Sequence, residues 1–102
     1  MSSRSDDADR GETKRVKAVV QGCVQGVNFR YHTRQKAREL GLRGHVRNVP
    51  DGTVEVVAQG DEADVRAMLA WLERGPRMAH VSEVQVDWQS PVHDEQRFRV
   101  RY

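Results

Sequence analysis

The order in which two hydrophobic periodicities follow one another is the feature that most constrains the fold of this chain. Five short segments are rich in apolar residues, and in most of them apolar and polar side chains alternate with the period of two that is typical of half-buried β-strands. Between the first and second segments, and between the third and fourth, the spacing changes to that of an amphipathic helix. The strands are expected at 15–21, 45–49, 53–59, 84–88 and 98–102.

The two helices have recognisable limits. The first is expected at 30–42, with Gly41 and Gly44 at its end. Its core-facing stripe consists of Phe29, Thr33, Ala37 and Leu40. The second begins after Asp61, a favourable N-cap residue, and ends at Gly75-Pro76. Its core-facing stripe consists of Val65, Met68, Leu69 and Leu72.

The turn between the second and third strands has its own signature. In Pro50-Asp51-Gly52 the proline fixes φ, and the Asp-Gly pair accepts the positive φ of a tight hairpin. The element order is then β-α-β-β-α-β plus a C-terminal strand. The economical packing for this order is an α+β, ferredoxin-like two-layer sandwich, an antiparallel sheet with two helices on one face.

Charge and composition divide the chain into a tail and one domain. Residues 1–13 hold four acids, two bases and almost no apolar side chain, so we expect a disordered tail there. Residues 14–102 form the expected domain, which carries +4 because the tail carries −2 and the whole chain +2. No apolar run approaches the ~18 residues of a membrane span. The lone cysteine, Cys23, excludes an internal disulfide. These features favour a cytoplasmic protein without membrane contact. We also expect a monomer.

The stretch Gly22–Arg30 (GCVQGVNFR) joins the first strand to the first helix. A helix N-terminus leaves backbone N–H groups unpaired and carries roughly half a positive charge. Gly22 and Gly26 allow the loop to turn such groups inward around an anion, and Arg30 can add a two-pronged contact. These features favour a phosphoryl group. The alternative is a pair of ordinary turn glycines and a solvated arginine.

Two better-known phosphate loops do not fit this stretch. Six residues separate Cys23 from Arg30, which is the wrong spacing for a phosphatase cysteine loop. Cys23 is instead expected to be a small buried residue at the strand end. A nucleotide P-loop is excluded because no Gly-Lys-Ser/Thr tripeptide is present.

The loop belongs to a longer pattern that resembles the acylphosphatases. The resemblance runs from about Val16 to Tyr102 and rests on GCVQGVNFR, Ala37, Gly41-Leu42, Gly44, Val46-Arg47-Asn48 and Asp51–Glu55. It implies a small ferredoxin-like enzyme that hydrolyses carboxyl-phosphate anhydrides without a metal, a cofactor or a covalent phosphoenzyme. The implied catalytic residues are Arg30, as phosphate ligand, and Asn48, which positions the attacking water. The implied phosphate-binding loop is Gln25, Gly26, Val27, Asn28, Phe29 and Arg30. Asn28 is a departure from the residues that the family uses more often at this position.

An acyl phosphate can be hydrolysed by a site with few catalytic residues. The leaving carboxylate has a conjugate acid with a pKa of about 4, so it departs without a general acid. Phosphoryl transfer passes through a loose transition state, and the enzyme contributes mainly positioning and charge stabilisation. The expected partner is a small-molecule acyl phosphate, with inorganic phosphate as product and competitive inhibitor.

Two other functions share this fold pattern. An RNA-binding module would have the same element order, but the segment 53–59 carries no aromatic residue for base stacking, and we expect no nucleic acid partner. A phosphate-sensing domain would bind the anion without hydrolysis.

Several other residues are assigned structural roles. Asp51 is expected to serve the hairpin turn, and Asn48 has a second interpretation as a cap for that turn. Trp71 and Trp88 are expected to be packing residues. The four histidines lack the mutual spacing of metal ligands.

Overall fold

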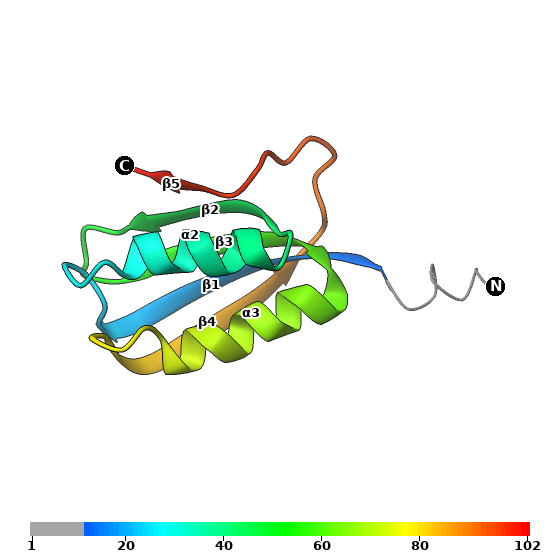
Figure 1. The fold of residues 1–102 in the computed structure, drawn as a ribbon. Helices are drawn as coiled ribbons and strands as arrows, with labels where there is room; N and C mark the ends of the chain where they lie inside the picture. Colours follow the sequence, from blue (N-terminus) through cyan, green and yellow to red (C-terminus); the bar gives the residue numbers. More distant parts are fainter. Residues whose placement is uncertain (1–11) are drawn as a thin grey trace.

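The computed structural model describes residues 12–102, so residues 1–11 of the expected tail lie outside the described residues. Seven elements follow one another along the chain (Figure 1): β1 at Thr13–Cys23, α2 at Phe29–Glu39, β2 at Arg43–Asn48, β3 at Val54–Asp61, α3 at Glu62–Arg74, β4 at His80–Gln89 and β5 at Arg99–Arg101. The predicted order of strands and helices is confirmed.

The five strands form one sheet in the order β4-β1-β3-β2-β5, and both helices cover the same face of it (Figure 1). The ferredoxin-like two-layer α+β sandwich is therefore confirmed. The expectation of a fully antiparallel sheet is wrong, because β5 runs parallel to β2, with Val46 opposite Val100. The cause is the route of the chain. After β4, residues 90–98 cross the end of the sheet and enter β5 beside the start of β2.

Element limits differ from the predicted ones by a few residues. The helix α2 ends at Glu39, since Gly41 takes a φ of 72° and the Leu42 N–H donates to the Ala37 carbonyl at 2.8 Å. Both features close a helix. The edge strand β4 begins at His80, four residues before the predicted Val84, because pairing with β1 extends it in a stretch without clear alternation.

The hydrophobic core lies between the sheet and the helices. Its buried side chains come from alternate positions of the strands and from the helix stripes: Val16, Ala18, Val20, Val54, Val56, Ala58, Phe29, Ala37, Val65, Met68 and Leu72. Removing this apolar surface from water is the main driving force for folding. Trp71 packs against the core as predicted, whereas Trp88 is 41% exposed and lies beneath the Arg66 guanidinium. No helix within residues 12–102 is long and apolar enough to cross a membrane.

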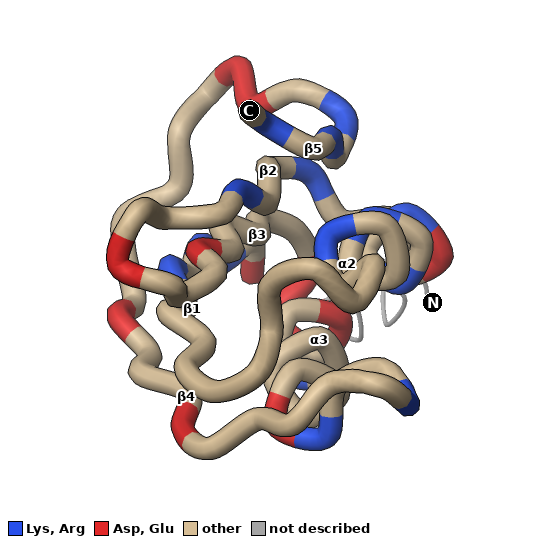
Figure 2. The backbone as a smooth tube through the Cα atoms, turned by 90° about the vertical axis from the view of Figure 1, so that its left-hand side faces the viewer, with Lys and Arg blue, Asp and Glu red and all other residues tan. Residues whose placement is uncertain are grey.

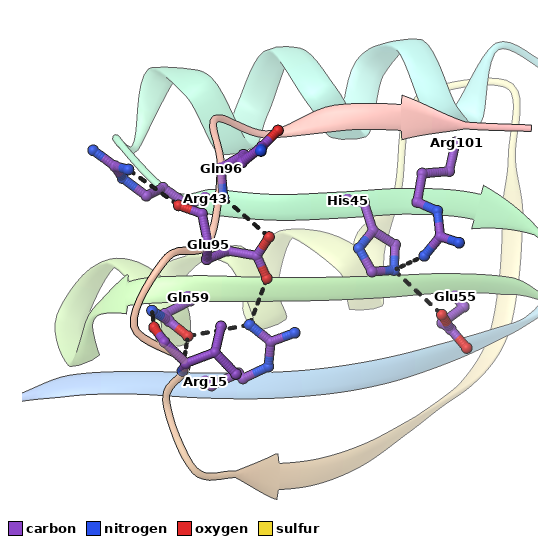
Figure 3. A network of polar contacts seen from close by, with 9 residues as sticks. Arg15, Arg43, His45, Glu55, Gln59, Glu95, Gln96 and Arg101 are labelled. Atoms are coloured by element: carbon purple, nitrogen blue, oxygen red, sulfur yellow. Dashed lines mark hydrogen bonds and ion pairs between the residues drawn. The ribbon is translucent and has the colours of Figure 1, made fainter.

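Polar side chains occupy the opposite face of the sheet, which neither α2 nor α3 covers, and they contact the crossover segment, residues 90–98 (Figure 3). Glu95 of this segment forms an ion pair with Arg15 of β1. The Gln59 carboxamide donates to the Val92 carbonyl at 2.8 Å and accepts from the Val92 N–H at 2.9 Å. These contacts fix the route that makes β5 parallel to β2.

Glu55 of β3 organises the rest of this face. Arg47 donates two hydrogen bonds to its carboxylate, at 3.1 and 3.2 Å. His45 Nε2 lies 3.5 Å from the same carboxylate and 3.4 Å from Arg101 Nη1. Burial raises the pKa of Glu55, but the hydrogen bond and charge of Arg47 outweigh it, and the pKa is lowered overall. Burial is the main reason why the pKa of His45 is lowered. We refer to Arg15, His45, Arg47, Glu55, Gln59 and Glu95 as the sheet-face network.

Candidate active site

A pocket of about 300 Å³ lies at the N-terminal end of α2. Figure 2 shows the molecule from the end that carries the β1–α2 loop, with Lys and Arg positions along α2 and around β5. Four parts of the chain form the pocket wall: the β1–α2 loop, the first turns of α2, the end of β2, and the C-terminal residues. The lining residues are Val24, Gly26, Asn28, Phe29, Arg30, Tyr31, Arg34, Asn48, Val100 and Tyr102.

The loop before α2 presents backbone donors without protein acceptors. Gly26 has a φ of 78°, and Asn28, the residue before the helix, has a left-handed conformation with φ of 61°. None of the backbone N–H groups of residues 25–30 donates a hydrogen bond to an acceptor within residues 12–102. A Cβ built on Gly26 would meet no atom within 4 Å, so the space beside it is open. This arrangement is suited to an anion.

The two loop glycines serve different purposes, which corrects the sequence interpretation. Gly22 does not line the pocket. It has a φ of 128° at the irregularity where β1 pairs with β4, and a Cβ there would lie 2.1 Å from the His80 carbonyl oxygen. Gly22 is therefore required by the close approach of two strands, and Gly26 is the glycine of the pocket.

Two residues of the predicted phosphate-binding loop lie outside the pocket lining. Gln25 Nε2 donates to the Val49 carbonyl at 2.9 Å and to the Thr53 carbonyl at 2.8 Å. Val27 is half-buried and packs against the core. Gln25 thus ties the loop to the β2–β3 turn, and the residue just before that turn is Asn48. The other four predicted loop residues line the pocket.

Arg30 lies in the first turn of α2 and lines the pocket. Its guanidinium stacks on the ring of Tyr102, with 5.0 Å between the guanidinium carbon and the ring centroid. No carboxylate within residues 12–102 forms an ion pair with it. Stacking uses the flat face of the guanidinium group, so its in-plane N–H donors stay available. None of these donors bonds to an acceptor in the described part of the chain.

Asn48 is the last residue of β2 and lines the same pocket as Arg30. Its Oδ1 is buried and has no hydrogen-bond partner among the described residues. The turn that follows is capped by Asp51 instead, whose Oδ1 accepts from the Thr53 N–H at 3.0 Å and from the Thr53 hydroxyl at 2.7 Å. These two bonds lower the pKa of Asp51. The prediction for Asp51 is confirmed, and Asn48 does not act as the turn cap.

The remaining candidates lie elsewhere. Cys23 ends β1 as predicted but is exposed, so the expectation of a buried residue is wrong. Within residues 12–102, no group of three or more His, Cys, Asp or Glu side chains is placed to hold a metal ion.

Sequence reasoning did not select Tyr31, Arg34, Val100 or Tyr102, all of which line the pocket. The position of Arg34, four residues after Arg30 on one helix, was a usable signal, because residues at this spacing share a helix face. Val100 and Tyr102 reach the pocket only through the pairing of β5 with β2, which no local pattern indicates.

The fold and this pocket define a class of small ferredoxin-like domains with a polar pocket at the start of the first helix. The acylphosphatase family profile matches residues 16–100. Two similar proteins are acylphosphatases from Acaryochloris marina, 52% identical over 74% of this chain and 81% of its own length, and from an Anaeromyxobacter species, 47% identical over 89% and 98%. The solved structure of an acylphosphatase from Coxiella burnetii matches with a TM-score of 0.83 and 38% identity, covering 99% of this chain and all of that one. The chain belongs to the acylphosphatase family.

Proposed function

We propose that this chain hydrolyses the carboxyl-phosphate bond of acyl phosphates, with the reaction taking place in the pocket at the start of α2. One observation carries the proposal. The unpaired N–H groups of Gly26, Asn28, Phe29 and Arg30 belong to residues that line one pocket together with the Arg30 guanidinium and the buried Asn48 Oδ1, and none of these groups has a partner among the described residues. A buried polar atom without a partner, such as Asn48 Oδ1, is costly, so a pocket that places it beside open N–H donors and a guanidinium favours a polar ligand.

In the proposed mechanism, the loop N–H groups and Arg30 hold the three peripheral oxygens of the phosphoryl group. Charge-assisted hydrogen bonds of this kind stabilise the negative charge of the transition state. The positive end of the α2 dipole adds to them. The chain itself thus supplies the positive charge that stabilises the transition state, and no step of the proposed mechanism uses a metal ion.

The nucleophile is a water that donates a hydrogen bond to Asn48 Oδ1. Its oxygen forms a bond to phosphorus in line with the bond that breaks, between phosphorus and the acyl oxygen. The electron pair of that bond leaves with the carboxylate, and the water proton passes to a phosphoryl oxygen. The products are a carboxylate and inorganic phosphate, and we expect phosphate to compete with the substrate for the pocket.

A cytoplasmic location and a monomeric state complete the proposal. The single cysteine, exposed at the end of β1, is compatible with a reducing compartment. One chain supplies every residue of the pocket, so the proposed reaction does not need a second copy.

The test is phosphate release from benzoyl phosphate, measured with and without a chelator and at increasing inorganic phosphate. Turnover that persists in the chelator and is competitively inhibited by phosphate is expected. Phosphate binding without turnover would replace this proposal with a phosphate-sensing domain. A submicromolar, salt-sensitive RNA complex without turnover would favour the RNA-binding alternative.

A further inference from the structure

Arg34 is a pocket residue for which the proposed reaction has no use. It is half-buried on α2, one helical turn after Arg30, and lines the same pocket. Its guanidinium stacks on Tyr31 at 5.6 Å and forms no ion pair or hydrogen bond with the described residues. The pocket lining contains no acidic residue. Two guanidinium groups therefore share a space in which one phosphoryl group is held by Arg30.

Another arginine on the same face of α2 forms a structural hydrogen bond that Arg34 lacks. Arg38, one further turn along α2, donates from Nε to the Phe98 carbonyl at 2.9 Å and so ties the helix to the chain leading into β5. Arg34 makes no equivalent bond to β5. A half-buried cation without a counter-charge is unfavourable, and a bound anion would offset this cost.

The pocket also has room beyond the phosphoryl group. Its volume of about 300 Å³ lies at the lower limit for sites that bind small organic ligands. Residues four apart on a helix have Cβ atoms about 5–6 Å apart, so one short ligand can reach both arginines. The rings of Tyr31 and Tyr102 provide apolar surface beside them.

We propose that Arg34 binds a second anionic group on the acyl half of the substrate, which makes this chain selective for acyl phosphates that carry an additional carboxylate or phosphate. This inference rests on the proposed function. Arg34 is a specificity residue in this scheme, since it touches the substrate away from the atoms that react. Its guanidinium forms a charge-assisted hydrogen bond with the distal anion in the ground state and in the transition state alike.

The test compares 4-carboxybenzoyl phosphate with 4-carbamoylbenzoyl phosphate, which have nearly the same shape and differ in charge. The corresponding 3-substituted pair covers a shorter reach. We expect the wild-type chain to favour the carboxylate in kcat/KM, and Arg34→Gln to reduce this preference roughly five- to tenfold, mainly through KM. Arg34→Lys keeps the charge and should retain most of the preference.

The matched control is Arg99→Gln, which removes the same charge from an exposed position on β5 outside the pocket lining. It should leave the carboxylate preference unchanged. A wild-type chain without the preference for either pair, or a preference that Arg34→Gln leaves intact, would overturn the role of Arg34 while acyl phosphate hydrolysis stands. If none of these compounds is hydrolysed by the wild-type chain, the proposed function itself fails.

Competition by 4-carboxybenzylphosphonate and 4-carbamoylbenzylphosphonate provides a readout of binding alone. The carboxylate should bind more tightly to the wild-type chain, and Arg34→Gln should bring the two inhibition constants together. Equal constants in the wild-type chain would count against the proposal.

Discussion

The pocket at the start of α2 and the sheet-face network both contain arginines, but the polar groups of the network have protein partners and those of the pocket largely do not. In the network Arg15 pairs with Glu95, Arg47 with Glu55, and Gln59 with the backbone of the crossover segment. In the pocket the loop N–H groups and Asn48 Oδ1 have no partners among the described residues. Completed polar pairs fix the fold, whereas open ones cost stability and are expected where a ligand binds.

One strand contributes to both regions. Successive side chains of a strand point to opposite faces of the sheet. On β2, His45 and Arg47 therefore join the network, while Val46 enters the core and Asn48 reaches the pocket. Arg47 and Asn48 are neighbours in the sequence, but the network and the pocket lie on opposite faces of the sheet, so the two regions can be altered independently.

The largest effect is expected for Arg30→Ala. Loss of this contact to the developing charge should lower kcat/KM for benzoyl phosphate by on the order of 10²–10³, with little change in the free energy of unfolding. Arg30→Lys should recover little, because the two-pronged guanidinium is lost. Arg15→Ala, in the network, should destabilise the fold and leave kcat/KM of the folded fraction unchanged. Wild-type turnover in Arg30→Ala would contradict the proposed site.

Asn48→Ala is expected to act on one step of the reaction. Without Oδ1 to orient the water, kcat should fall by on the order of 10². The inhibition constant of inorganic phosphate should stay the same, since the loop and Arg30 remain. Steady-state kinetics with phosphate as inhibitor separate the two quantities. A weakened phosphate affinity with an unchanged kcat would assign Asn48 to binding and exclude the water-positioning role.

Glu95→Gln should weaken the network and spare the pocket. The side chains of Arg15 and Glu95 are only 13% and 11% exposed, so the variant leaves a largely buried guanidinium without its counter-charge. We expect a loss of roughly 1–3 kcal/mol in the free energy of unfolding, measured with urea. Glu39→Gln breaks a pair on the surface of α2 in which Glu39 is 70% exposed, and should change stability little. Equal losses of unfolding free energy in the two variants would show that the Arg15–Glu95 pair stabilises the fold no more than an exposed ion pair does.

The smallest effect concerns pH. Burial lowers the pKa of His45, so the unfolded chain takes up a proton near pH 6.5 and the folded chain does so only at a lower pH. The unfolding free energy should therefore fall as pH decreases below about 6.5, by at most ~1.4 kcal/mol per pH unit from this group. His45→Gln should flatten this decline, and replacement of the exposed His80 should not. The loss below pH 4.5 from Glu55 and Glu95, whose pKa values are lowered, should persist in both variants.

Local patterns in the sequence were sufficient for the element order, the two helix stripes and the Asp51 turn. Each depends on residues within a few positions of one another, where side-chain periodicity and turn chemistry act directly. The same holds for the first half of the pocket, since the loop with Gly26 leads straight into the helix turn that carries Arg30. The family resemblance added Asn48, which the residues alone favoured as a turn cap.

Only the tertiary structure decided which strand β5 joins, which glycine the sheet requires, and which C-terminal residues complete the pocket. Val100 and Tyr102 meet the start of α2 because the crossover segment carries β5 to β2, and Gly22 is needed because β4 passes close to it. These outcomes depend on contacts between residues far apart in sequence. Their free energies are set by the packing and polar pairing of the whole sheet, and no short stretch of the chain contains that information.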